Sequence, residues 1–299
     1  HLTLTQAFGG SNPSGAAISN QTRRKAGLAF SGCAFAMSGV VTRVRQSRFA
    51  MEPPMVASFP AQQTPLDGLD AAMRQRGYAV LAADAVAALA GVAVSEFAAL
   101  LPSWDDLRPD AYLKDGGRYR KRRHSCFIAE GDELRQVPHR MHWQSLDYNA
   151  LHGGMQRWFE PMATTVVAQP VWSKLLLALA HTCTARMPSP RWCIEAHQFR
   201  IDTVDGLGRP TPEGAHRDGV DFVAVLLVAR AGIKGGETRV FEAAGPDGQR
   251  FTLGEPWSML LLDDARVIHE STPIQPVGDY GYRDTLVLTF RAAGFQGEV

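Results

Sequence analysis

The sequence lacks the features that define several large classes of protein. None of its apolar runs approaches the roughly 20 residues that a membrane-spanning helix needs. Its formal net charge is +1, so no excess of one sign draws it to nucleic acid or to an anionic membrane surface. We therefore expect a small molecule as the partner of this chain, and neither nucleic acid nor a membrane.

Cysteine is scarce and scattered. The chain has four cysteines, and no two of them form a C-x-x-C pair. Neither a zinc site nor a disulfide framework is therefore indicated. This usage is typical of a reducing compartment, and we expect a cytoplasmic protein. The cysteines are Cys33, Cys126, Cys183 and Cys193.

Acidic residues are absent from the first 51 positions, which hold several arginines and end at Met51. An acid-free leader rich in arginine and serine can be a targeting segment. Its poor hydrophobic periodicity instead favours a disordered extension, translated from upstream of a start at Met51 or Met37. With the proline-rich stretch 53–65, it makes a region 1–65 that we expect outside the fold. Residues 66–299 are then expected to form a single domain.

Beyond residue 65, the hydrophobic pattern changes along the chain. It predicts helices early, with Asp84 and Ser95 as caps of two of them, and short strands separated by turn residues later. This order predicts an α+β, mainly β fold: a jelly-roll core over about 192–292 with the helices outside. The predicted helices are 66–76, 84–89, 94–101 and 172–182, and the predicted strands are 77–81, 192–201, 222–228, 239–241, 251–253, 258–262 and 285–290.

The main candidate catalytic residues lie in the stretch 213–219, in which His216 and Asp218 are two residues apart. Residues i and i+2 of a strand share a face, so both side chains would lie together at the beginning of the strand 222–228. His269 follows near the end of another apolar segment. Two imidazoles and one carboxylate are the facial ligand set of non-haem Fe(II) enzymes, whereas H-x-D alone also occurs by chance in solvated turns.

A basic run occupies 118–124 and alternates as a strand does. Its alternation would place Arg118, Arg120 and Arg122 on one face. That face is either solvated or a grip for a small carboxylate, a task that suits the guanidinium fork. The run is short and no aromatic-interleaved basic surface extends beyond it, so nucleic acid fits less well.

Several amides and histidines are further candidates for a polar pocket. Gln144, Asn149 and Gln198 either line such a pocket or are amides satisfied in the core. His139 and His142 lack a third ligand at a sensible spacing, so we expect them on the surface or in supporting contacts rather than on a metal.

Four motifs in the second half occur in a recognisable order: Glu213-Gly-x-His-x-Asp-Gly, Gly235-Gly-Glu-Thr, His269-Glu-Ser-Thr and Arg283-Asp-Thr-Leu. Together with Gln144-Ser-x-x-Tyr-Asn and Gly153-Gly-x-x-Arg, they resemble the 2-oxoglutarate- and Fe(II)-dependent dioxygenases. The resemblance spans about 75–292 and is nearest to the bacterial isoleucine dioxygenase-like hydroxylases of free L-amino acids.

The resemblance implies a role for particular residues. His216, Asp218 and His269 would bind Fe(II), and 2-oxoglutarate would chelate that metal. Arg283, assisted by Thr285, would bind the far carboxylate of 2-oxoglutarate, with Arg291 as the alternative. The implied reaction consumes O2, converts 2-oxoglutarate to succinate and CO2 and hydroxylates a C–H bond, with ascorbate as the reductant that keeps the iron Fe(II).

The same subgroup implies a free aliphatic or sulfur-containing L-amino acid as substrate. Arg118, Arg120 or Arg122 would meet its carboxylate, and Glu213 or Asp221 its ammonium group. Alternatives remain: the same chemistry on a secondary metabolite, a protein side chain or a nucleobase, or a jelly roll that holds metal without turnover. A kinase catalytic loop is excluded, because the Leu and Asn that follow H-R-D in kinases are missing. A homodimer is an assembly compatible with the sequence.

Overall fold

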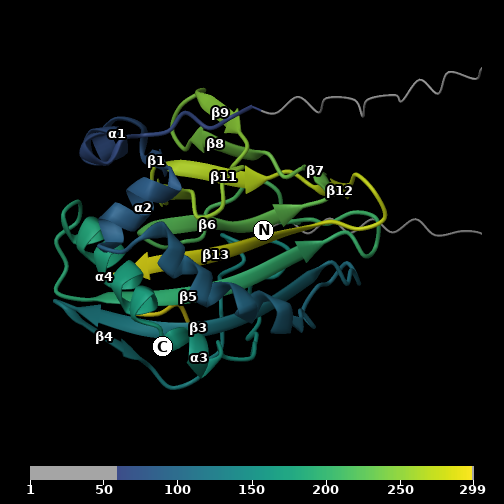
Figure 1. Cartoon of the computed structure of the whole chain (residues 1–299), viewed down its shortest axis with the longest axis horizontal. Helices are drawn as coiled ribbons and strands as arrows, with labels where there is room; N and C mark the ends of the chain where they lie inside the picture. The colour runs from purple at the N-terminus through teal and green to yellow at the C-terminus, as the bar shows by residue number, and fades with distance from the viewer. Residues whose placement is uncertain (1–58, 298–299) are drawn as a thin grey trace, which may run out of the picture. The chain divides into compact units, whose positions relative to one another are not determined.

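The computed structural model describes residues 59–297, so the predicted leader and most of the proline-rich stretch lie outside the described residues. Helices dominate the first half of this range and strands the second (Figure 1). The α-helices are α1 (Leu69–Arg76), α2 (Ala83–Ala90), α3 (Thr164–Val167) and α4 (Pro170–Thr184), and the 3-10 helices are η1 (Leu66–Gly68) and η2 (Val94–Asp106).

One large antiparallel sheet carries the fold. Its strand order is β1-β10-β6-β13-β5-β3-β2, and β4 pairs with β3 at its edge. The two longest pairings join β5 to its neighbours β3 and β13. The strands are β1 (Tyr78–Leu81), β2 (Arg108–Pro109), β3 (Arg120–Glu130), β4 (Glu133–Gln136), β5 (Trp192–Asp202), β6 (Phe222–Ala231), β10 (Met259–Asp263) and β13 (Tyr282–Arg291).

Two smaller sheets complete the sandwich. One has the order β11-β8-β9 and the other pairs β12 with β7. Val240 and Val267 of the first pack with Val223, Leu227 and Leu260 of the large sheet in one buried apolar cluster. The predicted mainly β jelly-roll architecture is therefore confirmed. The strands are β7 (Ile233–Gly235), β8 (Thr238–Glu242), β9 (Gly248–Phe251), β11 (Val267–Ser271) and β12 (Ile274–Pro276).

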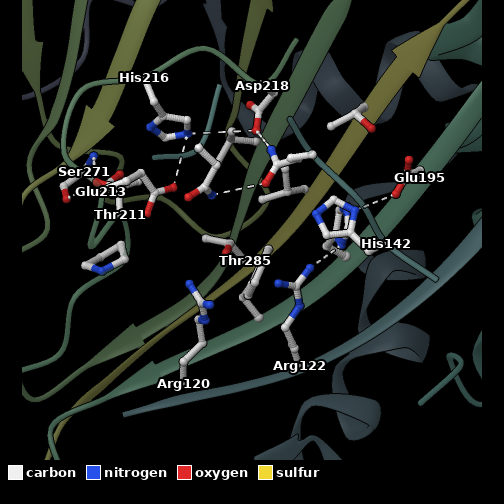
Figure 2. Close-up of a pocket in the computed structure, with 18 of the residues that line it drawn as sticks. Arg120, Arg122, His142, Glu195, Thr211, Glu213, His216, Asp218, Ser271 and Thr285 are labelled. Carbon is white, nitrogen blue, oxygen red and sulfur yellow. Dashed lines mark hydrogen bonds and ion pairs between the residues drawn. The ribbon is translucent and has the colours of Figure 1, made fainter. Parts of the chain in front are cut away.

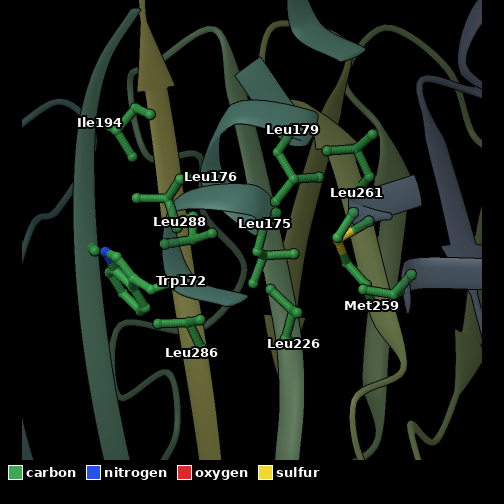
Figure 3. Close-up of a cluster of buried hydrophobic side chains, with 14 of the residues drawn as sticks. Trp172, Leu175, Leu176, Leu179, Ile194, Leu226, Met259, Leu261, Leu286 and Leu288 are labelled. Carbon is green, nitrogen blue, oxygen red and sulfur yellow. The ribbon is translucent and has the colours of Figure 1, made fainter. Parts of the chain in front are cut away.

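The helices cover the outer face of the large sheet. Alternate residues of each strand point to this face, and several of them in β5 and β13 are apolar and fully buried, for example Ile194 and Leu288. They meet the apolar stripe of α4, which includes Leu175, Leu176 and Leu179 (Figure 3). The intervening residues of the same strands point to the opposite, inner face of the sheet.

The structure differs from the predictions in two helix caps, one helix type and the limits of the sheet. Helix α2 begins at Ala83, and Asp84 lies inside its first turn, where its carboxylate accepts a hydrogen bond from the Ala85 N–H, so Asp84 is not the cap. The expected α-helix from Val94 is a longer 3-10 helix, and Glu96 rather than Ser95 binds a backbone N–H at its start. Strands β1 and β3 belong to the large sheet although they precede the predicted core at 192–292.

No single helix within residues 59–297 is long and apolar enough to cross a membrane. Only the bent pair of α2 and η2 reaches that length and composition together. Its apolar residues Val86, Phe97 and Leu100 are buried in the core beneath the helices.

Candidate active site

Three potential metal ligands converge at the mouth of the sandwich. His216 and Asp218 lie in the loop between β5 and β6, and His269 lies in β11. One ligand atom from each lies within 4.8 Å of those of the other two. The prediction placed the pair at the beginning of a strand and His269 at the end of the Trp257 segment. Both placements are wrong, since a loop and a separate strand supply them, but the predicted set does come together.

Backbone hydrogen bonds fix this meeting. His216 and His269 form an isolated antiparallel bridge, with N–H to carbonyl distances of 3.0 and 2.9 Å. The Nδ1–H of His216 donates to the carbonyl of Gly214 at 2.9 Å, which leaves Nε2 as the nitrogen with a free lone pair. His216 Nε2 lies 3.9 Å from Asp218 Oδ1, and His269 Nε2 lies 3.7 Å from Asp218 Oδ2. The ligand atoms therefore face one another.

Asp264 holds the loop that carries Asp218. Its buried carboxylate accepts hydrogen bonds from the backbone N–H groups of Asp218, Gly219 and Val220 at 2.9, 2.8 and 3.1 Å. Gly219 has a φ of +75°, and a Cβ there would lie 2.5 Å from the ring of Tyr148. The H-x-D-G sequence thus ends in glycine because the turn and the close packing leave no room for a side chain.

The electrostatics of the three residues suit a divalent cation. Burial raises the pKa of Asp218 to about 6, although His216 opposes that rise. Burial also holds the pKa of His269 well below its usual value, so this imidazole is neutral. A buried carboxylate with too little positive charge beside it and a neutral imidazole match what a first-row transition metal binds.

A buried arginine also lines the cavity beside the three potential metal ligands. Arg283 begins the inward-facing series of β13, and Thr285 and Val287 follow on the same face. The Arg283 atoms Nε and Nη2 are buried and have no hydrogen-bond partner among the described residues. Burial lowers the pKa of Arg283 to about 10, so the guanidinium keeps its charge at neutral pH. Such a group fits a carboxylate that approaches from the cavity.

The remaining cavity wall comes from β3, β5 and the segment before α3. The cavity encloses about 130 Å³. Arg120 and Arg122 reach it from β3 (Figure 2), and Arg157 and Gln144 line it from the segment 138–158. Arg120 Nη2, Arg122 Nε and Arg157 Nε are buried and have no hydrogen-bond partner within residues 59–297, and the same holds for Glu213 Oε2. The wall therefore offers several donors and one acceptor to a bound molecule.

A chain of hydrogen bonds links this wall to the metal ligands. Gln144 Nε2 donates to Asp218 Oδ1 at 3.3 Å. The Gln144 carbonyl oxygen accepts from Arg157 Nη2 at 2.9 Å and from Asn149 Nδ2 at 3.2 Å. Gln144 is thereby held on one side and orients Asp218 on the other.

Comparisons with known proteins decide the family. The family model of the 2OG-Fe dioxygenases matches residues 101–289. The chain belongs to this family. The curated proteins include none that matches this dioxygenase.

Several solved structures are similar to this chain. A BsmA homologue from Methylobium petroleophilum PM1 is 50% identical, with a TM-score of 0.76, over 82% of this chain and 100% of that one. IDO from Bacillus thuringiensis is 17% identical, with a TM-score of 0.61, over 76% and 99%. The Fe(II)/(alpha)ketoglutarate-dependent dioxygenase TqaL is 16% identical, with a TM-score of 0.59, over 76% and 86%. The last two show the shared fold.

Membership gives the dioxygenase its cofactor and co-substrates: Fe(II), 2-oxoglutarate and O2. Fe(II) supplies the activation of O2 when it is bound. The residues present fit these groups, since His216, Asp218 and His269 would hold the metal and the unpartnered guanidinium of Arg283 would hold the far carboxylate of 2-oxoglutarate. Arg291 lies at the far end of β13, where its Nη1 donates to the Gly294 carbonyl, and it does not line the cavity.

Three of the residues predicted to contact substrate lie elsewhere. Arg118 precedes β3 and is exposed, and its Nη2 pairs with Asp205 at 2.6 Å. Gln198 faces the outer side of β5, where its Nε2 donates to Ser103 Oγ at 2.6 Å. Asp221 accepts from the Ala292 N–H at 2.8 Å and is not part of the cavity wall. These predictions are wrong, whereas Arg120, Arg122, Gln144, Asn149 and Glu213 do line the cavity.

Two wall residues were missed in the sequence. Arg157 was noted only as part of a motif, and Glu195 was passed over in the apolar strand 192–201. The signal available for Glu195 was a charged residue inside an otherwise apolar strand, two positions before His197.

His142 was expected on the surface or in supporting contacts. It supports Glu195, because its Nδ1–H donates a hydrogen bond to Glu195 Oε2 at 2.7 Å. His139 Nε2 binds the Phe159 carbonyl at 2.7 Å, outside the cavity wall.

Proposed function

We propose that this dioxygenase hydroxylates a C–H bond of a free L-amino acid. In the balanced reaction, R–H, O2 and 2-oxoglutarate give R–OH, succinate and CO2. One atom of O2 enters the product, and the other enters succinate. Ascorbate would keep the iron reduced between turnovers. The observation that carries the proposal is the arrangement of charge at the end of the cavity formed by Arg120, Arg157 and Glu213.

These three residues match the two charged groups of an amino acid. In the part of the chain that the structure describes, Arg120 and Arg157 each have a buried nitrogen without a hydrogen-bond partner, and Glu213 has such an oxygen. Glu213 Oε1 lies 3.7 Å from His216 Nε2, so this acceptor is beside the metal ligands. A carboxylate bound by the guanidinium groups and an ammonium bound by Glu213 would hold the α-carbon near the iron.

The balance of charge supports a zwitterion. Four arginines of the wall are positive: Arg120, Arg122, Arg157 and Arg283. Four carboxylates offset them, namely Asp218, Glu195 and Glu213 in the wall and Asp110, whose Oδ2 accepts from Arg120 Nε at 2.7 Å. Fe(II) and the 2-oxoglutarate dianion cancel each other. A substrate with no net charge therefore keeps a buried site neutral, which lowers the cost of desolvation.

The test is succinate formation from 2-oxoglutarate by the full chain, with Fe(II) and ascorbate, in the presence of each common L-amino acid in turn. We expect one or a few of them to raise the rate and to yield a product heavier by one oxygen atom. The D-enantiomers serve as matched controls and should not. If no amino acid raises succinate above the rate without substrate, the proposal is wrong and the substrate belongs to another class.

A variant locates the amino-acid site. Glu213→Gln keeps the shape of the side chain and removes its charge, so it should raise KM for the amino acid more than KM for 2-oxoglutarate. Equal changes in both constants would argue against an ammonium contact at Glu213.

A further inference from the structure

The cavity has a second polar end, distant from Glu213. Figure 2 shows Glu213 and Arg120 towards one side, and His142 and Glu195 towards the other, with Arg122 between them. His197 and Thr289 also line the cavity: the His197 ring centre lies 4.7 Å from that of His142, and Thr289 of β13 pairs with Glu195 of β5. The end formed by His142, Glu195, His197 and Thr289 is called the distal end below. None of these residues belongs to the set of His216, Asp218 and His269, so the chemistry described so far leaves the distal end without a role.

Glu195 is the charged residue of the distal end. Its side chain is only 9% exposed. The Nε2–H of His124 donates to Glu195 Oε2 at 2.9 Å, and the Nδ1–H of His142 donates to the same oxygen at 2.7 Å. Two hydrogen bonds to the charged form explain why the pKa of Glu195 is well below its usual value despite burial that would raise it. Glu195 is therefore an anion.

One oxygen of this anion is left for a ligand. Both histidines converge on Oε2, and within residues 59–297 no donor is bound to Oε1. Glu195 lines the cavity. This oxygen is on a side chain that faces the cavity, so a bound molecule that excludes water from it without supplying an N–H or O–H would leave it unsatisfied, whereas a donor would satisfy it.

The neighbours of Glu195 are fixed in place. Arg122 donates from Nη2 to His197 Nδ1 at 2.7 Å. Its guanidinium lies 3.8 Å from the ring centre of Phe159 and 4.4 Å from that of Phe199. The distal end is thus a rigid polar wall that cannot easily turn its polar groups away from a ligand.

Resting on the proposed function, we infer that the substrate side chain ends in a hydrogen-bond donor, which binds Glu195 at the distal end. The class comprises amino acids with a terminal amide or hydroxyl group, which donate a hydrogen bond and leave the substrate without net charge. The aliphatic and sulfur-containing side chains implied by the sequence resemblance do not fit, because they would exclude water from Glu195 and supply no donor. An acidic side chain would meet the carboxylate with like charge.

A metal ion is a poorer occupant of the distal end, although His124, His142, Glu195 and His197 have the composition of a metal site. His197 Nδ1 already accepts a hydrogen bond from Arg122, so its other nitrogen carries the proton and has no lone pair for a metal. The Arg122 guanidinium also places a positive charge beside the four residues. A donor that brings one hydrogen bond fits this environment better than a divalent ion.

The test compares amino acids matched in size. We would measure kcat/KM for hydroxylation of glutamine against methionine, asparagine against leucine, and threonine against valine. A site built around a hydrogen bond strongly rejects analogues that cannot make it, so we expect a preference of at least about ten-fold for the donor in at least one pair. Glutamate should be a poor substrate. Preference for the apolar member in all three pairs would overturn the inference and leave the proposed function standing.

A variant then ties the preference to Glu195. Glu195→Gln keeps the shape and one acceptor oxygen but removes the charge, and charge-assisted hydrogen bonds are roughly twice as strong as neutral ones. The preference for the donor should fall several-fold. Glu160→Gln, the same change at a carboxylate that is 54% exposed, is the matched control and should leave the preference unchanged. An unchanged preference in folded Glu195→Gln would overturn the inference.

The wild-type comparison does not depend on the variant, so the inference stays testable if Glu195→Gln does not fold. If no amino acid of either kind is hydroxylated, the free amino-acid function itself is wrong and the inference falls with it. The panel therefore separates failure of the inference from failure of the function.

Discussion

The two faces of one strand, β5, differ in polarity and in what they contact. Its outer residues Ile194 and Ala196 are apolar and fully buried under α4. Its inner residues Glu195 and His197, one position away in each case, are polar and line the cavity. The period of two along a strand puts the core and the active site on opposite sides of a single layer of backbone.

The inner face also carries groups that folding leaves unsatisfied. Arg120, Arg157 and Arg283 each have a buried nitrogen without a partner in the described part of the chain, and such groups lower stability. The outer face makes up for this by dense packing of Trp172, Leu175 and their neighbours against the sheet (Figure 3). Stability and function are thus assigned to different residues of the same strands, and substitutions should separate them.

The largest effect on stability is expected from the outer face. Leu288→Ala removes a fully buried side chain of β13 and leaves a cavity beside α4, which should lower the free energy of unfolding by about 2–5 kcal/mol. Denaturant unfolding measures the loss. The folded variant should keep the wild-type KM for 2-oxoglutarate. A large rise in that constant would show that the two faces are not independent.

Arg283→Ala tests the inner face of the same strand. Loss of paired charge-assisted hydrogen bonds should weaken 2-oxoglutarate binding by roughly 100-fold, about 3 kcal/mol, with much less change in Fe(II) affinity. Titration of 2-oxoglutarate and of Fe(II) gives the two constants. Arg291→Ala is the control, because Arg291 lies outside the cavity wall. Equal loss of iron and 2-oxoglutarate would instead indicate misfolding.

A smaller effect is expected where the inner wall supports the metal ligands. Gln144→Ala removes the hydrogen bond to Asp218 Oδ1 and the acceptor for Arg157. Groups that orient metal ligands typically contribute about 10–100-fold in metal affinity or activity, and we expect a loss in that range. Asn149→Ala removes only one brace of Gln144 and should cost less. If Asn149→Ala costs more, Gln144 does not act through Asp218.

The sequence predicted the fold and the convergence of His216, Asp218 and His269 because the motifs are local and their order is specific. It could not predict how the loop is held, since the carboxylate that fixes Asp218 belongs to Asp264, 46 residues further on. Strand phase was the second obstacle. Both faces of 192–201 carry polar residues, and only the paired sheet shows that Gln198 points outwards and Glu195 inwards. Arg118 was misplaced for a related reason, because β3 begins at Arg120.

Acid pH should lower the stability of the protein through the buried histidines of the inner face. Burial lowers the pKa of His142 to about 3, and His124 and His197 are also shifted below the ordinary value of 6.5. In the unfolded chain these imidazoles take up protons as the pH falls below 6.5, whereas in the folded protein they do so only at lower pH. Stability is therefore lost as the pH falls from about 6.5, by up to about 1.4 kcal/mol per unit for His142, whose folded pKa is about 3.

His142→Gln isolates one of these contributions. The glutamine keeps an N–H for Glu195 but does not titrate, so the fall in unfolding free energy between pH 6.5 and 5 should be shallower than in the wild type by about 1.4 kcal/mol per pH unit. Denaturant unfolding at several pH values gives both slopes. His181→Gln is the control, since the His181 side chain is 53% exposed and its removal should leave the slope unchanged. Parallel slopes for wild type and His142→Gln would mean that His142 can take up a proton within the folded protein, and the inner face would then be less rigid than its hydrogen bonds indicate.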